Sequence, residues 1–291
     1  MTSNIDTKKL YEYCAIPVDK IENHPDLKVK IKIYESKDEV YRWLANDMLE
    51  EVRRNNLEGK LTRWILPCGP TKQYLYFIQW VNEQNISLKN VHVFHMDDHL
   101  DWQGRPVSLD NPYSYEGWMN RNFYGQIDPD LNIPETQRHF PDVYAIDEIS
   151  EAIDKIGGID SCFGGIGYRG LIAYNEEPRS PWYSVSMEEY KNSKTRIVHL
   201  NDDTLIALSQ RSSGGCSHII PPKAITLGMK DLLRSKRLRF ISETGAWKRT
   251  VIRYFLFGEP TLEYPVTLTQ DHPDVLVIVD RDTILPPLEG L

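Results

Sequence analysis

Residues 164–178 combine closely spaced glycines with carboxylates, a composition that suits a ligand site. The segment follows an apolar run over residues 159–163 and ends in Glu176 and Glu177. Four glycines fall within its first seven residues, at Gly164, Gly165, Gly167 and Gly170. Because glycine lets the backbone approach a ligand closely, this pattern predicts a strand that feeds a tight, ligand-facing turn.

Asp97 and Asp98 follow a second strand pattern, the alternating apolar residues 91–96. A carboxylate here could act as a shielded acid–base group or cap the turn that follows. A metal site is a third interpretation, because alternate residues share one face of an extended chain and all can be ligands. The residues that would form it are His95, Asp97, His99 and Asp101.

Two strand-to-helix turns could bind an anion. Residues 67–72 link a short apolar strand to a helical pattern, and a helix N-terminus offers free amides and a positive dipole end. Pro70 removes one of those backbone donors. Lys248 follows a strand pattern over residues 238–242 and opens another helix. The structural alternatives are an ordinary turn and a solvated lysine.

Strand and helix patterns alternate along the chain and position these turns. Ser36 and Glu39 form the capping-box pattern that precedes an amphipathic helix. This alternation predicts a doubly wound, mostly parallel α/β sheet in three layers, with the ligand beyond the carboxyl ends of the strands. We expect an N-terminal extension over residues 1–28 and one domain over residues 29–291. The strand patterns lie at residues 29–33, 64–66, 91–96, 161–163, 196–200, 224–227, 238–242 and 275–279.

The composition of the chain excludes some classes of binding partner. The 291 residues carry a net charge of −8, which argues against nonspecific nucleic-acid binding but not against a local phosphate site. No apolar run approaches the roughly 20 residues that span a bilayer, so we expect no membrane association. The four cysteines are scattered without a CxxC pair, which favours reduced thiols and a cytoplasmic location.

The motifs closely resemble those of the glucosamine-6-phosphate deaminases/isomerases. That family reads Gly-x-Gly-Asn-Asp-Gly-His-Ile-Ala-Phe-Asn-Glu-Pro, where residues 165–178 read Gly-Ile-Gly-Tyr-Arg-Gly-Leu-Ile-Ala-Tyr-Asn-Glu-Glu-Pro. Residues 94–99, Phe-His-Met-Asp-Asp-His, resemble its Phe-Asn-Met-Asp-Glu-Tyr. The resemblance covers most of residues 29–280 and implies the fold of this family.

The resemblance also implies roles for residues. Asp97 falls on the carboxylate that moves a proton between C1 and C2, and Glu176 on the glutamate that orients a ring-opening histidine. The family's Asp and His are Arg169 and Leu171 here, so that ring-opening device is absent. Arg169 could instead bind a second anion or form a salt bridge. The family's phosphate arginine falls at Gln210, with Arg211 one residue later.

We therefore expect three catalytic residues, Asp97, Glu176 and Arg169, with no metal and no cofactor. The substituted loop leaves His95, His99, Tyr168, Glu176 and Glu177 as candidate replacements for the ring-opening acid. The residues expected to bind the substrate and its phosphate are Cys68, Gly69, Pro70, Thr71, Asp98, Gly165, Gly167, Tyr168, Arg211 and Lys248.

The resemblance implies a homo-oligomeric isomerase or deaminase of a sugar phosphate, with an amino-sugar 6-phosphate as the expected substrate. One alternative is a sugar-phosphate-binding protein without catalysis, which the missing Asp and His favour. A second is a hydrolase similar to 6-phosphogluconolactonases, whose loop relies on the histidine that Leu171 replaces.

Overall fold

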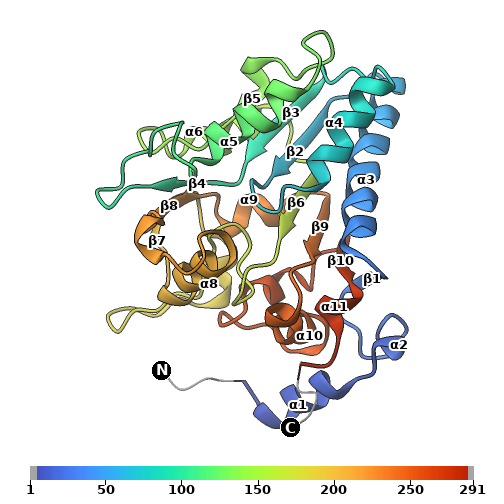
Figure 1. Cartoon of the computed structure of the whole chain (residues 1–291). Coiled ribbons are helices and arrows are strands. Elements are labelled where there is room, and N and C mark those ends of the chain that lie inside the picture. The colour runs from blue at the N-terminus through green and yellow to red at the C-terminus, as the bar shows by residue number, and fades with distance from the viewer. Residues whose placement is uncertain (1–4, 288–291) are drawn as a thin grey trace.

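The chain forms a twisted parallel sheet covered by helices on both faces, seen in a computed structural model that describes residues 5–287 (Figure 1). The strand order in this main sheet is β1-β10-β9-β6-β2-β3-β5, and every pair is parallel. The predicted fold class is therefore confirmed. The strands are β1 (Lys30–Tyr34), β2 (Thr62–Leu66), β3 (Val91–His95), β5 (Arg138–His139), β6 (Ser161–Gly165), β9 (Arg237–Ser242) and β10 (Val275–Asp280).

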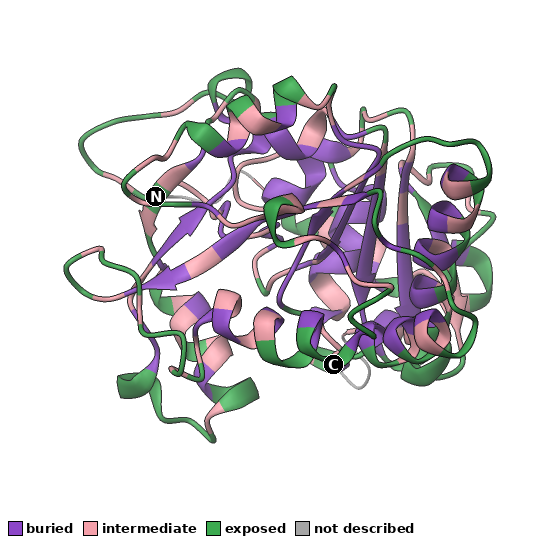
Figure 2. Cartoon of the chain, turned by 90° about the horizontal axis from the view of Figure 1, so that it is seen from above, coloured by how far each residue is buried: buried purple, intermediate pink, exposed green. Residues whose placement is uncertain are grey.

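Two hydrophobic cores lie on opposite faces of the main sheet because its strands are apolar on both sides. In β2, Trp64 and Leu66 face one core and Ile65 faces the other. The helices over the first face are α3 (Lys37–Leu57), α4 (Gln73–Glu83) and α5 (Tyr115–Asn122). Those over the second are α6 (Glu148–Lys155), α9 (Met229–Leu233) and α10 (Arg249–Phe257). Figure 2 shows buried strands between helices whose outer faces are exposed.

Local signals in the sequence explain how α3 begins and how it is fixed. The hydroxyl of Ser36 accepts a hydrogen bond from the Glu39 amide, and the Glu39 carboxylate accepts one from the Ser36 amide, which confirms the predicted capping box. Further along the helix, the buried carboxylate of Glu51 accepts hydrogen bonds from the Trp64 indole and the Ser161 hydroxyl. These bonds join α3 to β2 and β6.

A second, antiparallel sheet corrects the predicted arrangement. Its strand order is β4-β8-β7, formed by β4 (Asp97–Leu100), β8 (Lys223–Thr226) and β7 (Arg196–His199). The sequence predicted the strands at 196–200 and 224–227 as part of the parallel sheet and read 97–100 as a turn. Both interpretations were wrong, because an alternating pattern identifies a strand but not the strand with which it pairs.

The connection between the two sheets runs through Met96. Its amide donates to the Leu66 carbonyl in the main sheet, and its carbonyl accepts from the Leu227 amide beside the second sheet. The chain therefore passes from one sheet to the other within a single residue. Asp97, the next residue, starts β4 opposite Thr226.

Residues 5–28 pack against the rest of the described chain. Helices α1 (Thr7–Ala15) and α2 (Val18–Ile21) bury Cys14 and Ile21, and Figure 1 shows α1 beside α10. Arg253 of α10 donates to the carbonyl oxygens of Tyr13 and Ile16. A division of the chain at residue 28 stays a prediction.

The remaining helices are α7 (Met187–Lys191), α8 (Asp202–Ser212) and α11 (Arg281–Ile284). Within residues 5–287, no helix is long and apolar enough to cross a membrane. All four cysteines are unpaired: Cys14, Cys68 and Cys162 are buried, and Cys216 is exposed.

Candidate active site

A cavity of about 260 Å³ lies beyond the carboxyl ends of β2, β3, β6 and β9 and is covered by α8. This is where open parallel sheets bind ligands. Ten of the thirteen predicted site residues line it: Cys68, Gly69, Pro70, Thr71, Asp97, Gly165, Gly167, Tyr168, Arg211 and Lys248. The structure therefore brings together segments that are more than 170 residues apart in the chain.

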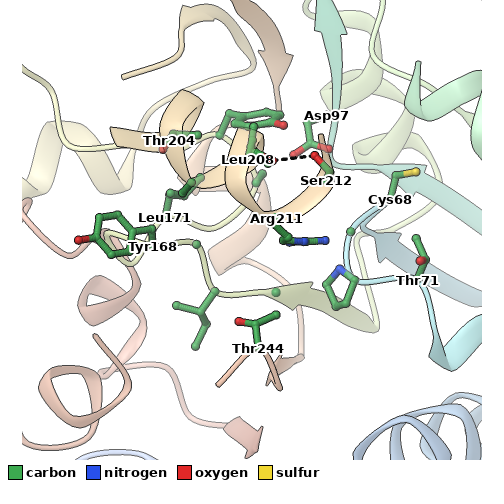
Figure 3. A pocket seen from close by; sticks show the side chains of 18 of the residues that line it. Cys68, Thr71, Asp97, Tyr168, Leu171, Thr204, Leu208, Arg211, Ser212 and Thr244 are labelled. Carbon is green, nitrogen blue, oxygen red and sulfur yellow. Dashed lines mark hydrogen bonds between the residues drawn. The ribbon is translucent and has the colours of Figure 1, made fainter. Parts of the chain in front are cut away.

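One end of the cavity, called the anion end below, combines a strand-to-helix turn with a cation. The turn after β2 presents Gly69 and Thr71, and an added Cβ on Gly69 would lie 3.6 Å from the Arg211 guanidinium. Figure 3 shows Arg211 reaching from α8 across the cavity toward this turn. An added Cβ on Gly165 would lie 2.7 Å from the Pro70 ring, so a glycine is needed for the two loops to approach.

Helix α8 decides which of two neighbouring residues faces this end. Gln210, at the position of the family's phosphate arginine, is exposed and is not among the lining residues. Arg211, one residue later, lines the cavity. The cation is therefore retained through a shift of one residue along the helix.

Lys248 lies behind this end and is buried, with an exposed fraction of 4%. Its amino group donates to the Ile166 carbonyl. Burial, together with the nearby Arg211 charge, lowers the pKa of Lys248 to about 7, although Glu243 opposes the shift. Lys248 is therefore a cation whose charge depends on pH near neutrality, and an anion in the cavity would favour its protonated form.

Glu243 is a lining residue that the sequence did not reveal. Its carboxylate accepts a hydrogen bond from the Tyr41 hydroxyl at 3.3 Å. Burial raises the pKa of Glu243, while Arg211 and Lys248 act in the opposite direction. This carboxylate offsets part of the positive charge at the anion end of the cavity.

Asp97 also lines the cavity and is only 7% exposed. Burial raises the pKa of its carboxyl well above the usual range, and the Asp98 charge adds to this shift. Burial and the same two aspartates also raise the pKa of the Cys68 thiol. A desolvated carboxylate with a raised pKa is a stronger base than a solvated one, which suits proton abstraction.

Asp98, in contrast to Asp97, holds the protein backbone and does not face the cavity. Its carboxylate accepts hydrogen bonds from the amides of His99, Tyr115 and Glu116, at 2.7–2.9 Å. It thereby fixes the start of α5 against β4 and is not among the cavity-lining residues. This placement corrects the expectation that Asp98 contacts the substrate.

The glycine-rich loop gives the cavity an apolar wall. An added Cβ on Gly167 would lie 2.2 Å from Leu171, so the leucine side chain covers the loop backbone. Tyr168 stacks on Trp247, with ring centroids 5.9 Å apart. Leu171, at the position of the family histidine, lines the cavity without a titratable group.

Arg169 and Glu176 are outside the cavity lining. Arg169 forms ion pairs with Glu177, Asp203 and Glu263, in agreement with the salt-bridge alternative. Glu176 accepts a hydrogen bond from the Asn201 amide at 2.8 Å. Burial raises the pKa of Glu176, and the hydrogen bond from the Asn201 amide opposes this shift. Neither side chain reaches the ligand space directly.

The geometry offers no support for the metal interpretation. His95 contacts the Tyr124 hydroxyl at 2.8 Å, whereas His99 contacts the Tyr174 hydroxyl at 2.8 Å. The change of sheet at Met96 separates residues that an extended chain would place on one face. In the part of the chain that the structure describes, no three His, Cys, Asp or Glu residues form a group that could hold a metal ion.

The sequence did not identify several lining residues, above all Tyr115 and Tyr174. A signal was present for Tyr174, because it is the position in the glycine-rich loop where the family has a phenylalanine. Thr204 and Ser212 of α8 also line the cavity, and Ser212 lies 3.5 Å from the Tyr113 hydroxyl (Figure 3). These two residues belong to no motif.

Arg211 should contribute most of the affinity that α8 gives to a phosphate. We expect Arg211→Gln to weaken binding of glucitol 6-phosphate about 10-fold or more, because a charge-assisted hydrogen bond contributes about 1.5–3 kcal/mol. The matched control is Gln210→Ala, which should change the dissociation constant less than about twofold. Titration calorimetry measures both. Equal weakening by the two substitutions would remove Arg211 from the anion site.

The pKa of Lys248 predicts pH-dependent phosphate binding. As the pH rises through about 7, the amine loses its charge, so the affinity for glucitol 6-phosphate should fall between pH 6.5 and 8.5. Lys248→Arg keeps the charge and should remove this pH dependence, whereas Lys248→Met should bind weakly throughout. A wild-type affinity that stays constant over this range would show that Lys248 does not contact the phosphate.

The raised pKa of Asp97 predicts a cost in stability. Since ionised Asp97 is disfavoured in the fold, stability falls as the pH rises above the unfolded pKa of about 3.9. Asp97→Asn should therefore raise the thermal midpoint at pH 8, by about 2–4 °C per kcal/mol, and leave it unchanged near pH 4. The exposed Asp130→Asn is the control. A lower midpoint for Asp97→Asn at pH 8 would contradict this account.

Comparisons with known proteins concern the family and the fold. No family model matches the chain. It is 29% identical over 250 residues to the glucosamine-6-phosphate deaminase of Thermoanaerobacter pseudethanolicus. The aligned region covers 83% of this chain and 90% of the relative. Among solved structures, a monomeric glucosamine-6-phosphate deaminase of the NagB superfamily superimposes with a TM-score of 0.74 at 24% identity, covering 87% and 98% of the two chains.

The fold is shared more widely. A 6-phosphogluconolactonase from Trypanosoma cruzi superimposes with a TM-score of 0.63 at 14% identity, over 90% of this chain and 97% of the other. At that identity only the fold is common to the two proteins. The sequence similarity to the deaminases, by contrast, covers most of both chains. The chain is a divergent relative of the glucosamine-6-phosphate deaminases.

Proposed function

We propose that this chain is a sugar-phosphate isomerase or deaminase that acts on an amino-sugar 6-phosphate. The observation that carries the proposal is a single cavity lined both by a buried carboxylate, Asp97, and by a turn with the cation Arg211 beside it. A sugar phosphate needs both features, since its phosphate and its reacting carbons lie at opposite ends of the molecule. The deaminase relatives supply the reaction class.

Asp97 is the base in this proposal. Its carboxylate takes the proton from the carbon next to the carbonyl, and the C–H electron pair forms a carbon–carbon double bond while the carbonyl π pair moves to oxygen. The carboxyl group then returns the proton to the former carbonyl carbon, whose oxygen takes up a proton while the C2 hydroxyl or amine loses one and the double bond moves to C2. With an amine at C2 the product is an imine, and water adds to it and releases ammonia. The anion end, with Gly69, Thr71, Arg211 and Lys248, holds the phosphate so that this carbon lies beside Asp97.

The substitutions in the glycine-rich loop bear on how the substrate arrives. Leu171 and the ion-paired Arg169 cannot transfer a proton to a ring oxygen. We infer that the enzyme takes the open-chain form of its substrate or opens the ring with another group. The same substitutions support the alternative of a protein that binds a sugar phosphate without turnover. The alternative of a lactonase is supported only by the similarity of the fold to that of 6-phosphogluconolactonases.

A turnover assay tests the function. Glucosamine 6-phosphate and other hexose 6-phosphates would be incubated with the protein in D₂O, with detection of ammonia and, by NMR, of deuterium at C1 or C2. We expect exchange or release with the wild type, and a loss of about 10²–10⁴-fold in Asp97→Asn. Binding without exchange would favour the inactive alternative. An unchanged rate in Asp97→Asn would remove Asp97 from the mechanism.

Three expectations from the sequence stay predictions. A homo-oligomer is one, and the structural relative described above is a monomer. A cytoplasmic location is the second. The identity of the sugar is the third, since an isomerase and a deaminase of different hexose phosphates would need the same carboxylate and the same anion site.

A further inference from the structure

A hydrogen-bonded chain of three side chains runs from the cavity into the protein interior. The hydroxyl oxygens of Tyr115 and Tyr174 lie 2.7 Å apart, and the Tyr174 hydroxyl lies 2.8 Å from Nε2 of His99. The three residues come from the start of α5, the glycine-rich loop and β4. Tyr115 and Tyr174 line the cavity, whereas His99 is 1% exposed and lies behind them.

The rings hold this chain in one geometry. The planes of Tyr115 and Tyr174 are parallel to within 5°. The His99 ring centroid lies 4.9 Å from that of Tyr115 and 5.2 Å from that of Tyr174. The Asp98 carboxylate, by accepting the Tyr115 amide, fixes the backbone from which Tyr115 extends. Little freedom remains for either hydroxyl to turn away.

The hydrogen-bonded chain reaches the cavity that Asp97 also lines. Burial and the Asp97 charge raise the pKa of both Tyr115 and Tyr174, so both phenols keep their protons. Burial lowers the pKa of His99 to about 4, and the Lys223 backbone opposes this only in part, so the imidazole is neutral. The three groups are therefore uncharged hydrogen-bond donors and acceptors next to a carboxylate.

Two departures from the family pattern create this contact. The motifs quoted above have Tyr at position 99 and Phe at position 174, whereas this chain has His99 and Tyr174. The exchange adds a hydroxyl at one position and an imidazole at the other, in hydrogen-bond contact. It occurs in the same chain that has Leu171 and Arg169 in place of the proton-transfer pair.

We propose that Tyr115 is a catalytic residue that donates a hydrogen bond to the substrate oxygen on which negative charge develops, and that Tyr174 and His99 are positioning residues. This rests on the proposed function. When Asp97 removes the carbon-bound proton, the carbonyl oxygen becomes an enediolate oxygen. Tyr115 keeps its proton and stabilises that charge through the hydrogen bond.

One of the two tautomers of the neutral imidazole orients the chain toward the cavity. A proton on Nε2 of His99 donates to the Tyr174 oxygen, and the Tyr174 hydroxyl then donates to the Tyr115 oxygen. The Tyr115 proton is left to point at the substrate. This tautomer is part of the proposal, because either nitrogen of a neutral imidazole can carry the proton.

A binding experiment tests this inference without turnover. The probe is a five-carbon aldonohydroxamate 5-phosphate, whose ionised hydroxamate resembles the enediolate, and arabinitol 5-phosphate is the matched ligand without that charge. We expect the wild type to prefer the hydroxamate, and Tyr115→Phe to remove about 10-fold or more of that preference. Tyr174→Phe should remove a smaller part. A wild type without this preference, or an unchanged preference in Tyr115→Phe, would overturn the proposal.

Kinetics add a second measurement for a substrate that the wild type turns over. Tyr115→Phe should lower kcat about 10²–10³-fold with little change in KM. The double variant with Tyr174→Phe should be no slower than Tyr115→Phe, because both act through one hydroxyl. If the two substitutions lowered kcat independently, so that their fold-losses multiplied in the double variant, Tyr115 and Tyr174 would not act through one hydroxyl. If Asp97→Asn lost the expected activity while Tyr115→Phe kept full activity, the role proposed for Tyr115, Tyr174 and His99 would be refuted. The proposed function would remain intact.

Tyr124→Phe is the control for lost stability. It removes the other buried Tyr–His hydrogen bond, the 2.8 Å contact with His95, which faces away from this cavity. We expect its thermal midpoint to fall about as far as that of Tyr174→Phe, with kcat and the hydroxamate preference unchanged. If Tyr124→Phe lowered kcat as much as Tyr174→Phe does, the hydrogen-bonded chain would affect activity only through the stability of the fold.

Discussion

The site depends on two backbone hydrogen bonds of Met96, one made by its amide and one by its carbonyl. They hold the end of β3 to the main sheet and the start of β4 to the second sheet. A chain that changes sheets within one residue turns away from the strand ends, and Asp97 is left at the edge where the cavity opens. Asp98, His99 and the start of α5 then take their positions from β4.

The groups that line the cavity influence one another's pKa values unequally. The pKa values of Lys248 and Glu243 depend on each other and on Arg211. The Asp97 charge instead raises the pKa of a thiol and two phenols, which keep their protons. The pKa of Asp97 itself is raised by burial and by the Asp98 charge, and in the proposed function this raised pKa suits a base.

Much of the fold could be predicted because strand and helix patterns are local. Every predicted strand is present, and the capping box of α3 has the expected bonds. The division into two sheets could not be predicted. A strand such as residues 224–227 has the same alternation whether it pairs with a parallel or an antiparallel neighbour, and that choice depends on contacts with residues far away in the sequence.

By itself, the sequence identified residues that could carry chemistry: Asp97, the turn at residues 67–72, the glycine-rich loop and Lys248. The tertiary structure decided which of them share a cavity. It put Arg211 rather than Gln210 over the turn, because side-chain direction on α8 depends on helical phase and packing. It turned Glu176 and Arg169 toward other partners, and it joined Tyr174 to His99. Those contacts connect side chains distant in sequence, so only folding brings them within hydrogen-bond reach.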